Sequence, residues 1–257
     1  MESGLKATAV AGRNAALERR TRGALAFGGA CLAALWLRGL AVLPAPGLFS
    51  VVVLCSYGLI AGTVLAKITA FHPHDRFGWP NVATLLRGTI ACFFLGLAVD
   101  LHWFSGSAGL TAGWWLAGLA AFAAALDGID GWMARRQRLH SRFGARFDME
   151  MDALLILAQA AMVVALGKAG VWLLALGLMR YVFVVAGLLH PPLARPLPDS
   201  VRRKAVCVAQ VVALTLMLAP PVSGVWATGL GVAALVLLLW SFGLDVIRLL
   251  ADGRRPS

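Results

Sequence analysis

Long, nearly uncharged apolar runs, separated by short polar or proline-rich stretches, constrain this chain more than any other feature. Eight such runs can be drawn, each of about the twenty residues that a helix needs to cross a bilayer. Backbone groups inside lipid must be satisfied within the protein, and these runs lack the alternation of barrel strands. With 60% hydrophobic and 14% charged residues, the sequence predicts an all-α, polytopic membrane helical bundle. We place the spans near 23–44, 48–67, 82–101, 110–133, 147–167, 171–190, 203–222 and 226–249.

The basic residues indicate which side of the membrane each loop faces. Lys and Arg outnumber Asp and Glu by 23 to 12, but they flank apolar spans and do not form the stripe or motif of a nucleic-acid-binding protein. The loops of one side hold only Lys168, with Arg38 near that end of the first span. By the positive-inside rule, the other side is cytoplasmic. We therefore expect a protein of a bacterial-type inner (plasma) membrane, with both termini in the cytoplasm and no nucleic-acid partner.

The first two spans contain no acidic residue, and we interpret them as an appendage to a core of six later spans. His72 and His74 follow these two spans in a polar stretch. Two histidines are too few to form a metal site by themselves. We therefore expect both side chains to lie in a solvated loop.

Acidic residues gather where the fourth and fifth spans meet. Five of the chain's 12 acidic residues fall between Asp127 and Asp152, and carboxylates at a membrane segment point to function because they are expensive to desolvate. Asp127 and Asp130 are three apart and Asp148 and Asp152 four apart, so each pair shares a helical face. Oxygen ligands of this kind suit Mg²⁺ or Mn²⁺. The alternative is that these acids cap helices and pair with neighbouring arginines.

The same stretch carries a resemblance to a known family. From Asp127 to Asp152 the chain matches, without a gap, the pattern D-x-x-D-G-x-x-A-R-x8-G-x3-D-x3-D, and on these positions it resembles the CDP-alcohol phosphotransferase (CDP-alcohol phosphatidyltransferase) family. The resemblance implies an integral membrane enzyme that displaces CMP from a CDP-linked lipid or alcohol. It also implies three parts: 1–77, a polar segment with two additional spans; 78–250, the catalytic core; and 251–257, a polar cytoplasmic tail.

Position by position, the resemblance implies a role for each motif residue. Asp127, Asp130 and Asp148 would hold the metal ions, two of them, that bind the CDP pyrophosphate. Asp152 would be the general base that takes the acceptor's proton. A second pattern, N-x-x-T-x-x-R, lies at the start of the first core span and would border the nucleotide. The residues implied to bind CDP are Gly131, Ala134, Arg135, Gly144, Asn81, Thr84 and Arg87.

Three basic residues of the later spans are candidates for binding the acceptor. Arg180 falls in mid-span, where an arginine should face a polar cavity; its alternative is a structural pair with Asp100 or Asp245. Arg203 and Lys204 lie where phosphate-accepting relatives often show the pattern G-K-x-K-T-x-x-Q, of which this chain keeps only part. The positive-inside bias alone would also place basic residues there.

The expected reaction transfers a phosphatidyl group from CDP-diacylglycerol to a small polar alcohol, with glycerol 3-phosphate as the leading acceptor. Serine, inositol (or its phosphate) and choline stay open as acceptors, as does transfer of a phospho-alcohol from a CDP-alcohol to diacylglycerol. A cation transporter is the alternative of another class, but it would distribute acids through the membrane thickness. A non-catalytic scaffold would tolerate loss of any motif aspartate. The resemblance further implies a homodimer surrounded by membrane lipids.

Overall fold

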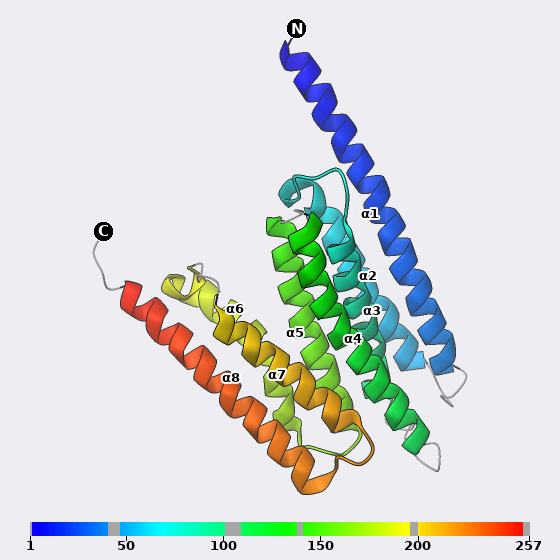
Figure 1. Cartoon of the computed structure of the whole chain (residues 1–257), viewed down its shortest axis with the longest axis vertical. Coiled ribbons are helices and arrows are strands. Elements are labelled where there is room, and N and C mark those ends of the chain that lie inside the picture. Colours follow the sequence, from blue (N-terminus) through cyan, green and yellow to red (C-terminus); the bar gives the residue numbers. More distant parts are fainter. Residues whose placement is uncertain (1, 41–46, 101–108, 138–140, 196–199, 254–257) are drawn as a thin grey trace. The chain divides into compact units, whose positions relative to one another are not determined.

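The computed structural model describes residues 2–40, 47–100, 109–137, 141–195 and 200–253. Within these ranges, the side chains of 2–11, 109–110, 129–137, 191, 194, 252 and 253 lie outside the description. All described elements are helices, and one α-helix covers most of each predicted span (Figure 1), which confirms the all-α prediction. The elements are α1 Glu2–Leu40, α2 Gly47–Phe71, α3 Trp79–Val99, α4 Gly109–Gln137, α5 Arg142–Ala165, α6 Ala175–Leu189, α7 Val201–Leu218 and α8 Gly224–Gly253, with short 3₁₀ helices η2 Val171–Leu174 and η3 Pro191–Ala194.

Five helical segments of the described chain are long and apolar enough to cross a membrane, which makes this an integral membrane protein. Helices α4, α5 and α7 are not among the five. Helix α5 carries three acidic residues in its first half, and α7 begins with three consecutive basic residues after Val201. The prediction that these three helices also span the bilayer stays a prediction. The five segments are Gly12–Leu40, Gly47–Phe71, Trp79–Val99, Val171–Leu189 and Gly224–Ala251.

Helix α1 begins much earlier than the first predicted span, at Glu2 instead of near residue 23. The stretch from Ala15 to Arg20 consists of strong helix formers and contains no proline, so nothing ends the helix before its apolar part begins. The polar N-terminal segment is thus a helical extension of the first span.

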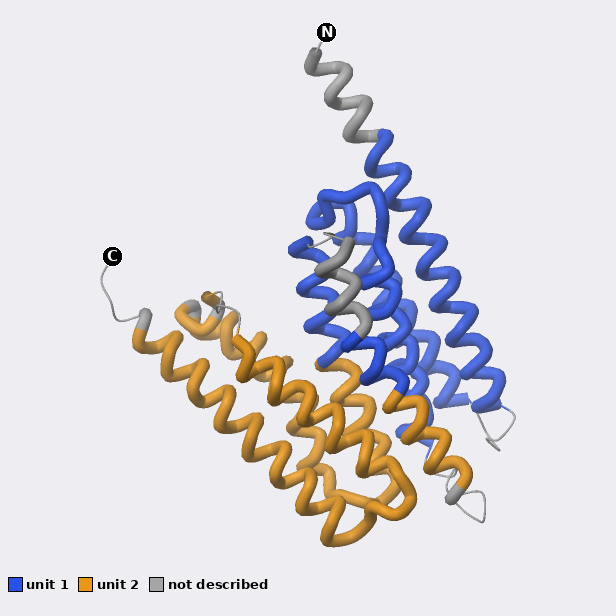
Figure 2. Tube along the Cα trace, in the orientation of Figure 1, with its two compact units in different colours: residues 1–103, 122–152 blue, residues 104–121, 153–257 orange. Residues whose placement is uncertain are grey.

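The chain forms two compact units, coloured separately in Figure 2. Unit 1 comprises residues 1–103 and 122–152, and unit 2 comprises 104–121 and 153–257. Helices α4 and α5 each contribute to both units, and their halves that bear the motif aspartates belong to unit 1. The two N-terminal helices therefore fold together with the acidic residues, in the same unit.

Helix α3 is the central helix of unit 1, because it is buried along most of its length while α1 and α2 expose large apolar side chains. The ring of Phe49 in α2 meets Phe93 of α3 edge to face at 5.9 Å. A Cβ atom at Gly96 would lie only 2.9 Å from the Phe49 ring, so glycine allows α2 to approach α3 closely. The Tyr57 hydroxyl donates to the carbonyl of Leu25 at 2.6 Å and ties α2 to α1.

Unit 2 contains a close contact between helices and an unusual cap. Gly177 of α6 packs directly on α5, where a Cβ atom at position 177 would lie 2.4 Å from the Cα of Leu157. The Lys168 ammonium donates to the carbonyls of Met217 at 2.9 Å and Ala219 at 2.6 Å. These carbonyls end α7, and a cation at a helix C-terminus is stabilising. Lys168 thus joins the end of α5 to the end of α7.

Candidate functional site

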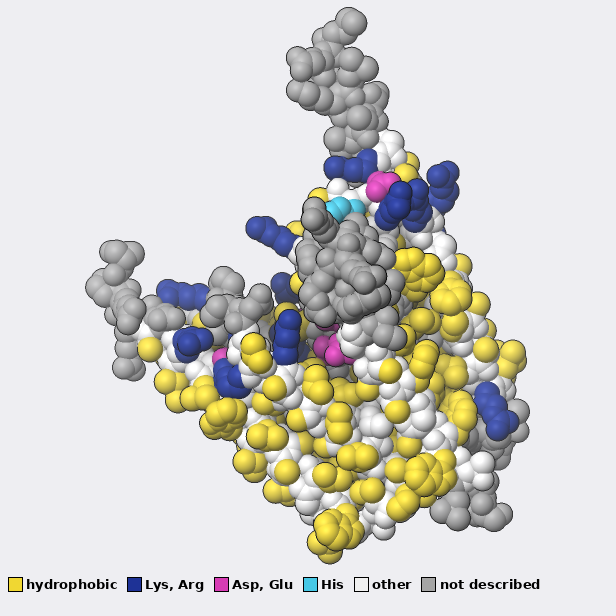
Figure 3. All heavy atoms as spheres, in the orientation of Figure 1, with side chains coloured by type: hydrophobic (Ala, Val, Ile, Leu, Met, Phe, Trp, Pro, Cys, Tyr) yellow, Lys and Arg dark blue, Asp and Glu magenta, His cyan; other side chains and the backbone are white. Residues whose placement is uncertain are grey.

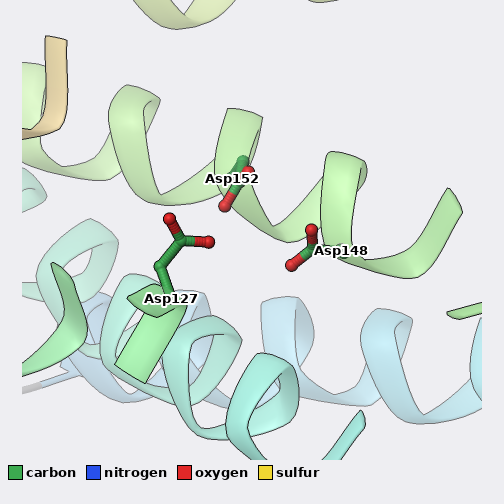
Figure 4. Close-up of side chains that lie close together, drawn as sticks. All are labelled: Asp127, Asp148 and Asp152. Atoms are coloured by element: carbon green, nitrogen blue, oxygen red, sulfur yellow. The ribbon is translucent and has the colours of Figure 1, made fainter. Parts of the chain in front are cut away.

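Three of the four motif aspartates converge in unit 1. Asp127 projects from α4, and Asp148 and Asp152 lie one turn apart in α5; Figure 4 shows the three side chains pointing toward one another. One carboxylate oxygen from each lies within 4.8 Å of the others. Asp130 lies in the same helix as Asp127, but its side chain is outside the described residues, as are those of Gly131, Ala134 and Arg135.

A buried arginine of α3 connects the three carboxylates. Nη1 of Arg87 lies 2.9 Å from Oδ1 of Asp127 and 3.0 Å from Oδ1 of Asp148. Nη2 of the same guanidinium contacts Asp152. The planar, forked guanidinium can serve several carboxylates at once, which a lysine ammonium does less well. Arg87 of α3 therefore contacts the consecutive helices α4 and α5 at one point.

The site has a closed side and an open side. The Arg87 side chain is 2% exposed, whereas those of Asp127 and Asp148 are 37% and 40% exposed and that of Asp152 is 20% exposed. Three carboxylates and one guanidinium leave two negative charges, which is the charge that one divalent cation neutralises. All available donors are oxygens, as Mg²⁺ and Mn²⁺ prefer. The residues present therefore fit a divalent metal ion.

Two other residues of the N-x-x-T-x-x-R pattern support the start of α5. The Thr84 hydroxyl lies 3.1 Å from the Pro80 carbonyl and 3.5 Å from Oδ1 of Asp148. Asn81 is buried, and its Oδ1 would lie 3.0 Å from a Cβ atom at Gly144. Gly144 therefore leaves the space that the Asn81 side chain fills, and the small residue allows α5 to begin against α3.

The expectation of a solvated loop at His72 was wrong. His72 is 3% exposed; its Nε2–H donates to the Arg76 carbonyl at 2.8 Å, and its Nδ1 lies 2.8 Å from Oγ of Ser141. Ser141 in turn caps α5, because its Oγ accepts the Gly144 N–H at 2.9 Å. Burial lowers the pKa of His72 and keeps the ring neutral. A serine directly before an apolar helix was the one available signal for this cap.

The acceptor candidates belong to unit 2. Arg180 lies in α6, and Arg203 and Lys204 lie in the first turn of α7. Asp245 of α8, which we considered as a structural partner for Arg180, contacts Arg202 and lies 3.8 Å from Nη1 of Arg203. Part of the basic run is therefore paired within unit 2, while Lys204 is exposed.

Together, the fold and the site define a class: an all-helical integral membrane protein with a carboxylate site able to hold a divalent metal ion. Within that class, the sequence profile of the family described as CDP-alcohol phosphatidyltransferase matches residues 77–240, more than half of the chain. The chain belongs to this family and is a transferase of phospholipid biosynthesis. Members of the family generally depend on a divalent metal ion. Comparisons with curated proteins and with solved structures gave no match.

Proposed function

We propose that this protein transfers the phosphatidyl group of CDP-diacylglycerol to glycerol 3-phosphate and releases CMP, at the cytoplasmic face of the membrane. The observation that carries the proposal is the convergence of Asp127, Asp148 and Asp152 within 4.8 Å of one another, inside the residues that the family profile matches. On its open side, this cluster could bind a pyrophosphate through a divalent cation. In CDP-diacylglycerol the pyrophosphate contains the bond that breaks when CMP leaves.

In this proposal Asp127, Asp130 and Asp148 would hold two Mg²⁺ or Mn²⁺ ions, and Asp152 would be the general base. When bound, the cations would neutralise the charge of the CDP pyrophosphate. Asp152 takes the proton of the acceptor hydroxyl. The acceptor oxygen then forms a bond to the phosphatidyl phosphorus, the bond from that phosphorus to the CMP oxygen breaks, and CMP leaves. Besides its proposed contact with CDP, Arg87 holds the three carboxylates in place through its contacts with Asp127, Asp148 and Asp152.

The finer assignments concern substrate contacts. For the CDP moiety we propose the motif's small and polar residues, and for the acceptor we propose three basic residues. The proposed CDP contacts are Gly131, Ala134, Arg135, Gly144, Asn81, Thr84 and Arg87, and the proposed acceptor contacts are Arg180, Arg203 and Lys204.

One observation favours a second candidate, an acceptor without a phosphate group such as serine, inositol or choline. Arg203 lies 3.8 Å from Asp245, so one proposed phosphate contact is already partly neutralised. The panel of acceptors in the experiment below must therefore include both kinds.

The test is metal-dependent CMP release by the purified full-length protein in liposomes, with CDP-diacylglycerol and one acceptor at a time. Asp152→Asn should lower the rate about 10²- to 10⁴-fold, the usual contribution of a general base. Glu150→Gln is the matched control, because it removes one negative charge from the same turn of α5 and should keep nearly full activity.

The acceptor that supports CMP release identifies the substrate. Release with serine, inositol or choline but not with glycerol 3-phosphate would replace the leading acceptor and keep the reaction. No release with any acceptor from folded, metal-loaded protein would contradict the proposal and favour a transport function. Equal rates in Asp152→Asn and Glu150→Gln would remove Asp152 as the base.

A further inference from the structure

Unit 1 contains a second candidate binding site, whose lining includes none of the motif aspartates. A pocket of about 780 Å³ lies between α1, the connection from α2 to α3, and the first turn of α3. This volume is in the range of pockets that hold small ligands. Arg20 and Ala24 line it from α1, Asp75 and Arg76 from the connection, and Trp79 and Val82 from α3.

The polar end of the pocket carries a net positive charge. Oδ2 of Asp75 lies 3.3 Å from Nη1 of Arg20 and 3.9 Å from Nε of Arg76, so two guanidiniums share one carboxylate. All three side chains are more than 40% exposed, and exposed ion pairs of this kind are weak. A phosphate group can therefore compete for both arginines, since the guanidinium fork matches phosphate oxygens. Lys and Arg side chains gather at this end of unit 1 (Figure 3).

The other end of the pocket is apolar and is lined by residues of two helices that are long and apolar enough to cross a membrane. Ala24 lies within the first membrane-crossing segment, and Val82 lies within the third. Trp79 is the first residue of α3 and is 64% exposed. Tryptophans in this position mark the level of the lipid headgroups in membrane proteins. The pocket thus combines two arginines with apolar residues from two candidate membrane-crossing helices.

We propose that this pocket binds the phosphate of an anionic membrane phospholipid, with its acyl chains passing Trp79 into the bilayer. Four of the eight lining residues, Arg20, Ala24, Asp75 and Arg76, precede residue 77, where the family match begins, so the segment that this chain adds to the family core forms half of the site. The proposal is independent of the transferred group and the acceptor. A soluble phosphate ester shares the headgroup chemistry, and the experiment separates the two sources.

The test is titration of the full-length protein in detergent with phosphatidylglycerol or phosphatidylcholine of the same chain length, with bound lipids counted by native mass spectrometry. The double variant Arg20→Gln/Arg76→Gln should bind phosphatidylglycerol about tenfold more weakly, because it loses charge-assisted contacts to the phosphate. Arg13→Gln/Arg248→Gln removes the same charge at exposed positions outside the pocket and should change binding less than twofold. Ala24→Trp, which fills the apolar end without changing charge, should also weaken binding.

Three results would overturn the proposal. One is an equal loss in both double variants, which would mean diffuse attraction of the whole basic surface. The second is equal binding of phosphatidylcholine by the wild-type protein. The third is displacement of the lipid by inorganic phosphate or glycerol 3-phosphate at comparable concentration, which would identify a soluble ligand. Unchanged thermal unfolding of the Ala24→Trp protein would show that its loss of binding is not a loss of fold.

Discussion

At the scale of single residues, Arg87 organises the site. Its side chain is 2% exposed and contacts three carboxylates from two helices. Removing one partner of a buried ion pair destabilises because charges are left uncompensated. Here the three carboxylates are partly exposed, so water screens part of the repulsion that would remain.

We predict that Arg87→Ala lowers the free energy of unfolding by about 2–4 kcal/mol and makes stability depend on divalent metal. Mg²⁺ or Mn²⁺ would restore part of the loss, because a cation can neutralise the carboxylates in place of the guanidinium. Thermal unfolding in detergent, with metal or with a chelator, measures both effects. Arg87→Lys keeps the charge and should be intermediate. If chelator affected wild type and Arg87→Ala equally, the compensating role of Arg87 would be wrong.

The sequence predicted the acidic half of the site better than its basic half. The spacing of Asp127, Asp148 and Asp152 follows from helical periodicity, so their convergence required only that two neighbouring helices meet. Arg87 was identified from a family pattern, but its position among the carboxylates depends on how α3 packs against both helices. Such long-range packing has no local signal in the sequence. His72 was misjudged for the same reason, since its partner Ser141 is 69 positions away.

At the scale of elements, glycine determines how closely helices approach. Gly177 allows α6 to lie against the backbone of α5. A Cβ atom at position 177 would meet backbone atoms of Leu157, which cannot rotate away as the end of a side chain could. Helix association in membranes depends on such small residues because lipid gives little hydrophobic driving force between helices.

We predict that Gly177→Ala lowers the free energy of unfolding by about 2–3 kcal/mol, in the range of overpacked cores. Gly243→Ala in α8 is the matched control, because no atom lies within 4 Å of a Cβ there. Denaturant unfolding of both variants in the same detergent gives the comparison. Equal stability of the two variants would show that α6 can shift away from α5 without cost.

The cap at the start of α5 gives a pH-dependent prediction. Burial lowers the pKa of His72 below its ordinary value of 6.5, so the unfolded chain binds this proton more readily than the folded one. The contribution of His72 to stability is therefore present above pH 6.5 and is lost as pH falls toward its lowered pKa. Wild type should lose more thermal stability between neutral and mildly acidic pH than His72→Asn. The exposed His190→Asn control should follow wild type.

At the scale of the whole molecule, hydropathy predicted where the helices lie in the sequence but not how they divide into two compact units. Apolar runs marked all eight long helices, because length and composition are local properties. The division into two units could not be predicted from hydropathy, because α4 and α5 each contribute residues to both units. Helices α5 and α7 carry charged residues in their N-terminal halves and are not among the five segments that are long and apolar enough to cross a membrane. The homodimer implied by the resemblance stays a prediction.

The orientation of the chain can be tested in sealed vesicles of known sidedness. In a protein whose four native cysteines are replaced by alanine, Pro73→Cys lies in the α2–α3 connection and Gly170→Cys lies between α5 and α6. Both positions are exposed. A membrane-impermeant thiol reagent should label only Gly170→Cys from the outside, as the positive-inside rule requires. Labelling of Pro73→Cys from that side would reverse the predicted topology.

The contact between Arg87 and the three aspartates also bears on how the protein is made. Many metal sites assemble only when the ion arrives, because their clustered ligands repel one another until then. In this chain the Arg87 guanidinium of α3 is the counter-ion of the aspartates. Because α3 precedes α4 and α5 in the sequence, this arginine is synthesised before the aspartates. We therefore expect the protein to fold without a bound metal ion and to bind the ion afterwards, as a late step of its biogenesis.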